Sequence, residues 1–103
     1  MRVDETANGN EIRMRVGETL DVVLAETRTT GYRWNVASDG APVCRLERDR
    51  FEAPPAAVPG APGRHTWTFT AVQVGATTIE LAYARSFAGG EAARRFTLRV
   101  VAQ

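Results

Sequence analysis

The chain has 103 residues, 44% of them hydrophobic, and its 13 basic and 12 acidic residues give a net charge of +1. This length suits one domain, which buries about two-thirds of the surface that its unfolded chain exposes. We therefore expect a single domain over residues 1–103, with residues 1–9 as a disordered N-terminal tail. Acidic residues alternate with arginines along the chain, which argues against the uncompensated basic face of a nucleic-acid-binding protein.

Apolar and polar residues alternate with a period of two through most of the chain, and turn residues separate the runs. The first predicted strand covers residues 11–16 and is followed by a turn at Gly17-Glu18. The second covers residues 19–26, and the third covers residues 32–36. The side chains predicted to point inward from these strands are Ile12, Met14, Val16, Leu20, Val22, Leu24, Tyr32, Trp34 and Val36.

A break at residues 38–42 precedes a fourth strand at residues 43–51, which is rich in charges. Such a strand suits the edge of a sheet, where charges discourage pairing with other chains. Residues 53–63 contain four prolines and two glycines and are predicted to form a loop. The side chains predicted to point inward from the fourth strand and from the strands after the loop are Cys44, Leu46, Trp67, Phe69, Ile79, Leu81, Tyr83, Phe96, Leu98 and Val100.

The last three predicted strands cover residues 66–74, 77–84 and 94–101. Gly75 forms the turn after the first of them, and residues 86–92 form a loop before the last. This makes about seven strands with turns roughly every ten residues and no convincing helical segment. The pattern predicts an all-β, immunoglobulin-like β-sandwich.

Residues suited to catalysis are few and dispersed. The chain has one histidine (His65), one cysteine (Cys44) and two serines (Ser38 and Ser86). We expect Cys44 to be a buried, inert thiol and His65 to be solvated at the edge of a loop. The carboxylates are scattered among arginines, so no metal or cofactor site is expected. The sequence thus predicts a protein that acts by contact and is not an enzyme.

Other sequence features limit the possible disulfides, membrane contacts and cellular compartment. A single cysteine permits no intrachain disulfide. No apolar run approaches the roughly 20 residues needed to cross a bilayer, so we expect no membrane partner. We also expect the chain to be a monomer. The first residues, MRVDETANGNE, lack the apolar core of a signal peptide. The compartment stays open, because a processed or truncated form of a periplasmic or secreted protein would look the same.

Three unusual loops are predicted to share one end of the sandwich, because loops between alternate strand pairs gather there. They cover residues 27–31, 53–64 and 85–92, whereas the other end has plain turns. A rigid scaffold with distinctive loops at one end is typical of a binding protein. The alternative is that Phe87 and Tyr32 only cover the core and that Arg85 pairs with Glu91.

These loops resemble those of the chagasin family, which are protein inhibitors of papain-like cysteine proteases. The family pattern has a first loop reading N-P-T-T-G-Y-x-W, a middle loop reading G-x-G-G and a late loop reading R-P-W or R-P-F. Order and spacing agree from residue 11 to residue 101. The matching segments are Thr29-Thr30-Gly31-Tyr32 with Trp34, then Gly60-Ala61-Pro62-Gly63, and finally Arg85-Ser86-Phe87.

Four positions, spread over the three loops, depart from the family pattern. Thr27-Arg28 replaces Asn-Pro, so the first loop lacks a stiffening proline and gains a charge. Pro62 replaces a glycine and removes a backbone N–H, and Ser86 replaces the proline of the last loop. We expect each change to reduce affinity through poorer preorganisation.

The resemblance implies reversible inhibition by three loops that enter the active-site cleft of the protease. Thr29, Thr30 and Gly31 would lie over the catalytic cysteine and histidine, with Tyr32 at the base of the loop. The segment Gly60-Ala61-Pro62-Gly63 would run along the non-primed side. Arg85-Ser86-Phe87 would pack on the primed side. A second hypothesis, favoured by the departures, is an immunoglobulin-like adhesion or accessory module without protease contact.

Overall fold

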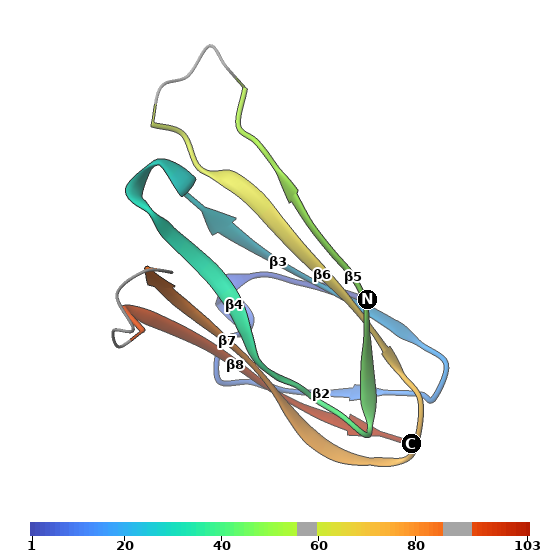
Figure 1. Ribbon diagram of the computed structural model, residues 1–103. Helices are drawn as coiled ribbons and strands as arrows, with labels where there is room; N and C mark the ends of the chain where they lie inside the picture. Colours follow the sequence, from blue (N-terminus) through green and yellow to red (C-terminus); the bar gives the residue numbers. More distant parts are fainter. Residues whose placement is uncertain (56–59, 86–91) are drawn as a thin grey trace.

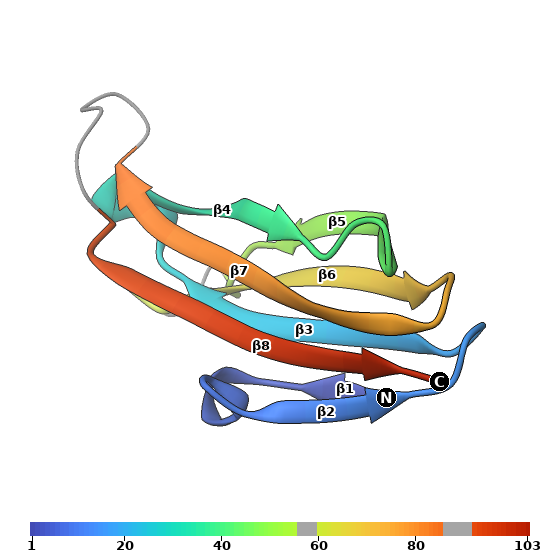
Figure 2. The same ribbon diagram turned by 90° about the horizontal axis from the view of Figure 1, so that it is seen from below.

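Strands with one apolar face must cover it, and here they do so by forming two sheets that pack face to face. The computed structural model describes residues 1–55, 60–85 and 92–103. Each sheet has four strands, and the sheets form the two layers of a sandwich (Figures 1 and 2). The predicted all-β, immunoglobulin-like sandwich is confirmed, with eight strands among the described residues where about seven were expected.

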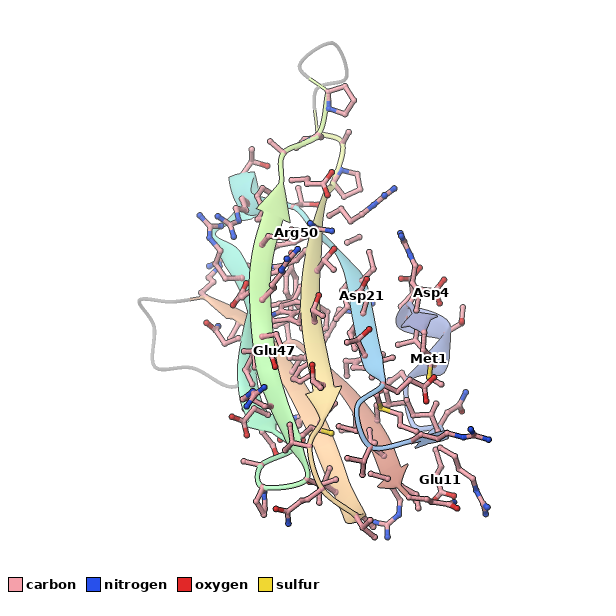
Figure 3. All side chains as sticks on the ribbon, turned by 90° about the vertical axis from the view of Figure 1, so that its right-hand side faces the viewer. Met1, Asp4, Glu11, Asp21, Glu47 and Arg50 are labelled. Atoms are coloured by element: carbon pink, nitrogen blue, oxygen red, sulfur yellow. The ribbon has the colours of Figure 1, made fainter. Side chains whose placement is uncertain are left out.

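The first sheet has the strand order β1-β3-β6-β5. Its strands are β1 (Arg2–Val3), β3 (Thr19–Glu26), β6 (Gly63–Ala71) and β5 (Cys44–Glu52). The charged strand β5 lies at an edge of this sheet, as predicted. Figure 3 shows Glu47 and Arg50 on β5, with Asp21 on β3 across the intervening β6.

The second sheet has the order β2-β8-β7-β4. Its strands are β2 (Glu11–Met14), β8 (Arg94–Ala102), β7 (Gly75–Arg85) and β4 (Tyr32–Asp39). In this sheet β2 pairs with β8 in parallel, and the other pairs are antiparallel. The described residues also include two 3₁₀ turns, η1 (Glu5–Ala7) and η2 (Arg28–Thr30), and none of these segments is a helix able to cross a bilayer.

The N-terminal segment differs from the expected disordered tail. β1 pairs with β3 in parallel, and the Asp21 N–H donates to the Met1 carbonyl over 2.9 Å. The side chains of Val3 and Ala7 pack against the core. The prediction failed because two residues of strand and one 3₁₀ turn are too short to give a periodic pattern.

The core confirms the alternation for most of the strands. Leu20, Val22, Trp67, Phe69 and the other inward residues of β3, β6, β7 and β8 are buried, whereas Tyr83 is half-buried. Val16 was predicted to point inward but is 44% exposed, because β2 ends at Met14 and Val16 belongs to the turn. Strand β6 starts at Gly63, three residues earlier than expected, and residues 72–74 form the turn that was placed at Gly75.

Candidate functional site

Three connections leave the sandwich at one end, which we call the loop end: its described residues are 27–31, 53–55, 60–62, 85 and 92–93. In Figure 1, η2 lies at the upper left, the facing ends of β5 and β6 point toward the top, and β7 ends at the left. Strand register supports this placement. Glu26 is paired with Gly63, and Glu52 with Arg64, at the end of the first sheet. Tyr32 is paired with Arg85 at the same end of the second sheet.

The first loop is a single 3₁₀ turn closed by a glycine. Gly31 has φ 83° and donates its N–H to the Arg28 carbonyl over 3.0 Å. This left-handed conformation favours glycine, since a Cβ would clash with the backbone. The Thr30 hydroxyl donates to the Thr27 carbonyl over 2.7 Å. Thr29 and Thr30 are exposed, so the turn presents a threonine pair at the tip.

A buried carboxylate lies directly under this turn. Glu26, the last residue of β3, is fully buried. Its Oε1 accepts the backbone N–H of Trp34 over 2.6 Å and lies 3.2 Å from His65 Nδ1. Its Oε2 accepts Arg28 Nε over 2.7 Å. Burial by itself raises the pKa of Glu26, but the hydrogen bonds from Trp34, Arg28 and His65 outweigh it and hold the pKa below its ordinary value.

His65 was expected to be solvated, and that expectation is wrong. The residue is 5% exposed, because it lies on the same inward face of β6 as Trp67 and Phe69, two and four residues later. Its ring stacks on Trp67 with a centroid distance of 3.9 Å. Its Nε2 contacts the Asp49 carboxylate of β5. His65 and Glu26 therefore form a polar cluster beneath the loop end, which the sequence analysis missed.

Arg28 is held on both sides. Besides its ion pair with Glu26, its guanidinium lies 3.8 Å from the centre of the Phe51 ring. The carbonyl oxygen of Arg28 accepts Arg33 Nη1 over 3.1 Å. The expectation of a looser first loop, based on the missing proline, overlooked these contacts.

Aromatic rings continue the core toward the loop end. The Tyr32 ring stacks on the Tyr83 ring with a centroid distance of 5.3 Å, and the Trp34 ring packs against Tyr83 with a centroid distance of 4.9 Å. Trp34 is buried and Tyr32 is half-buried, so both hold the base of the first loop as predicted. The Arg85 guanidinium lies 4.9 Å from the centre of the Tyr32 ring and is exposed. Arg85 therefore joins the end of β7 to the base of the first loop.

The middle loop divides into exposed and buried positions. Gly60, with φ 77°, and Pro62 are exposed, and Ala61 is half-buried. Gly63 is buried as the first residue of β6. A Cβ on Gly63 would lie 2.3 Å from Phe51 Cζ and 2.6 Å from the Glu52 carbonyl oxygen. Glycine is thus required at residue 63 by packing. Ser86 and Phe87 lie outside the described residues.

The candidate catalytic groups are placed apart from one another. Cys44 is buried, and burial together with the nearby Asp39 raises the pKa of its thiol, which keeps it in its unreactive form. The Ser38 hydroxyl donates to the Thr78 carbonyl at the other end of the sandwich. Across residues 1–55, 60–85 and 92–103, no group of His, Cys, Asp or Glu side chains is arranged to hold a metal ion.

Comparison with known families identifies the chain. The model of the chagasin family of peptidase inhibitors, I42, matches residues 13–100. The chain belongs to the chagasin family. Members of this family are inhibitors of peptidases, and the matched region includes all three connections of the loop end.

Related proteins agree with this family. Amoebiasin-1 from Entamoeba histolytica is 31% identical over 103 residues, which cover 100% of both chains. The crystal structure of EhICP2, described as a cysteine protease inhibitor from Entamoeba histolytica, is 26% identical with a TM-score of 0.88. The match covers 99% of this chain and 94% of that one. The solution structure of Amebosin is 29% identical with a TM-score of 0.81, covering 99% and 96% of the two chains.

Proposed function

We propose that this chagasin-family chain is a reversible inhibitor of papain-like cysteine proteases and that it binds them through the loop end. The observation that carries the proposal is that Thr29–Tyr32, Gly60–Gly63 and Arg85, which belong to the three family-pattern segments, lie at one end of the sandwich. Scattered catalytic groups support action by contact, without catalysis. A contact of the usual size, about 800 Å² per partner, is a modest share of the 6074 Å² surface of this chain.

The exposed turn Arg28–Thr30 is the part that enters the active-site cleft. Thr29 and Thr30 cover the catalytic residues of the protease, and Gly31 lets the backbone approach closely. A 3₁₀ turn differs from the extended conformation in which proteases bind substrates, so the loop blocks the nucleophile without offering a bond for cleavage. Gly60, Ala61 and Pro62 extend along one side of the cleft.

On the other side of the cleft, the binding residues are Arg85, Ser86 and Phe87. Arg85 is exposed at the end of β7 and is oriented by the Tyr32 ring. Arginine and aromatic side chains are the types that most often dominate binding energy at protein interfaces. Gly63 has a supporting role, since it is buried against Phe51.

Titration of papain with the purified domain tests this function. We expect complete, reversible inhibition, with activity recovered on dilution and the domain uncleaved on a gel. Active-site-titrated papain gives the stoichiometry, and a serine protease such as trypsin serves as the control. Full papain activity at micromolar concentrations of the domain would refute inhibition of that enzyme. A pull-down that recovers a non-protease partner, with binding unaffected by changes at Thr30 and Arg85, would favour the accessory-module hypothesis.

A further inference from the structure

One buried carboxylate joins the first loop to both sheets of the sandwich. We propose that Glu26 is a positioning residue for inhibition, and that its ion pair with Arg28 preorganises the first loop in place of a proline. This inference rests on the proposed function, because it assigns the loop contacts a role in protease binding. The cluster consists of Glu26 on β3, Arg28 on η2, Trp34 on β4 and His65 on β6.

Glu26 holds the residue at which the chain returns from the loop. Its Oε1 accepts the Trp34 backbone N–H, and the Trp34 indole N–H donates to the Ala25 carbonyl over 3.0 Å. Trp34 is therefore tied to both of the last two residues of β3. The segment between these ties, residues 27–33, contains the exposed threonine pair. Since both its ends are held, few conformations remain for the tip.

The side chain of Arg28 holds the 3₁₀ turn at the start of this segment in place. Its Nε donates to Glu26 Oε2, and its guanidinium stacks on Phe51 of β5. Arg28 is also the first residue of η2, a position that suits proline, and Thr27 before it is extended with φ −101° and ψ 92°. Proline and the Glu26–Arg28 pair are thus two ways to restrict the same backbone position.

The same carboxylate lies beneath the middle loop. His65 is two residues beyond Gly63, where the chain re-enters the sheet after that loop. Its Nδ1 lies 3.2 Å from Glu26 Oε1, while its Nε2 contacts Asp49 on the neighbouring strand β5. Glu26 thus links the base of the first loop to the start of β6. Loss of its charge is expected to loosen both connections together.

Three variants test the proposal: Arg28→Ala, Arg28→Pro and Glu26→Gln. The matched control is Arg45→Ala, which removes the exposed Arg45–Glu47 pair on β5. We expect Arg28→Ala to raise the inhibition constant for papain about tenfold by loss of preorganisation. Arg28→Pro should restore it to within about threefold of the wild type. Arg45→Ala should leave it unchanged. If Arg28 acted only through its charge or its guanidinium contacts, Arg28→Pro would not restore inhibition, because proline has neither group.

A double-mutant cycle separates this coupling from independent effects. If Arg28 acts through Glu26, Glu26→Gln and Arg28→Ala together should weaken inhibition no more than the stronger single change. Effects that multiply would overturn the proposal, as would an Arg28→Ala inhibition constant equal to that of Arg45→Ala. Should Glu26→Gln fail to fold, the Arg28 variants still decide, through the rescue by proline.

Amide hydrogen exchange gives a readout that does not depend on inhibition. We expect the amides of residues 29–33 to exchange at least about fivefold faster in Arg28→Ala, and at the wild-type rate in Arg28→Pro. Amides of β7 and β8 serve as the internal reference. Unchanged exchange in residues 29–33 would refute the positioning role. If the wild type does not inhibit papain but exchange responds as expected, the proposed function fails while the structural coupling stands.

Discussion

Arg85 ends strand β7 with its guanidinium over the Tyr32 ring, so an exposed charge is held in one orientation at the loop end. A preoriented arginine loses little side-chain entropy on binding. We predict that Arg85→Ala weakens inhibition of papain by about 1–3 kcal/mol, measured as the ratio of inhibition constants. Arg13→Ala, an exposed position on β2, is the control. For Phe87→Ala the family pattern alone gives the same prediction, and unaltered inhibition in both variants would assign binding to another loop.

Gly63 shows a different requirement at the residue scale. A Cβ at this residue would overlap the Phe51 ring and approach the Glu52 backbone within 2.6 Å. Backbone cannot move as freely as the end of a side chain, so Gly63→Ala should destabilise the fold by about 1–3 kcal/mol. Thermal or urea unfolding measures this. Melting at the wild-type temperature would show that the start of β6 shifts at no cost.

The alternation of inward and outward residues predicts part of the polar cluster beneath the loop end. Leu20, Val22 and Leu24 alternate inward, and the next residue of that parity is Glu26. Trp67 and Phe69 point back in the same way to His65. Alternation therefore predicts that both polar residues face inward, but it cannot show that they meet, because Glu26 and His65 are 39 positions apart in the sequence and are brought together only by the pairing of β3 with β6. Pairing register comes only from the assembled sheet.

At the scale of elements, the Glu26 carboxylate links the end of β3 to the first residues of β4 and β6. The stability of this junction therefore depends on pH in the acid range. Burial raises the pKa of Glu26, but the hydrogen bonds outweigh this effect, so the folded-state pKa lies below the ordinary value. Its stabilisation is therefore fully present above the unfolded-state pKa of about 4.3 and is lost as pH falls through the folded-state value. We predict that the free energy of unfolding decreases with acidification below about pH 5.

The contribution of Glu26 is measured as a difference between variants, because other carboxylates also respond. Hydrogen bonds from Thr6 lower the pKa of Asp4, and a hydrogen bond from the Arg45 guanidinium lowers the pKa of Glu47. Urea unfolding at several pH values should give a flatter acid limb for Glu26→Gln than for the wild type. An identical slope in both proteins would show that the cluster does not titrate with folding.

The sequence predicts which strands are present better than it predicts where each strand begins and ends. All seven predicted strands occur, because each has several alternating residues. Several errors fall at glycines and short segments: β6 begins at Gly63, β7 begins at Gly75, and the pair Arg2–Val3 was taken for a tail. In addition, β4 was predicted to end at residue 36 but continues to Asp39, into the predicted break at residues 38–42. A glycine is compatible with either a turn or a strand, and tertiary packing decides, as the Phe51 ring does at Gly63.

At the scale of the whole molecule, the sandwich separates its scaffold from its binding end. β1 pairs with part of the edge of β3, and Figure 2 shows β1 beside β2 at the margin of the sandwich. Figure 3 places Met1 and Asp4 alongside β3, away from β5. The register pairs Arg2 with Asp21 and Val3 with Val22, near the middle of β3 and not at its Glu26 end.

Deletion of residues 1–7 should therefore lower stability without changing inhibition. The deletion removes the backbone hydrogen bond from Asp21 to Met1 and uncovers core surface now shielded by Val3 and Ala7. We expect a loss of about 1–3 kcal/mol, or several degrees in melting temperature for a chain of this size. The inhibition constant for papain should stay within about twofold of the wild type, because the contacts that order Thr29 and Thr30 come from Glu26, Arg28 and Trp34. Equal losses of stability and inhibition would mean that the loop end depends on the whole sheet, and the separation of scaffold from binding end would be wrong.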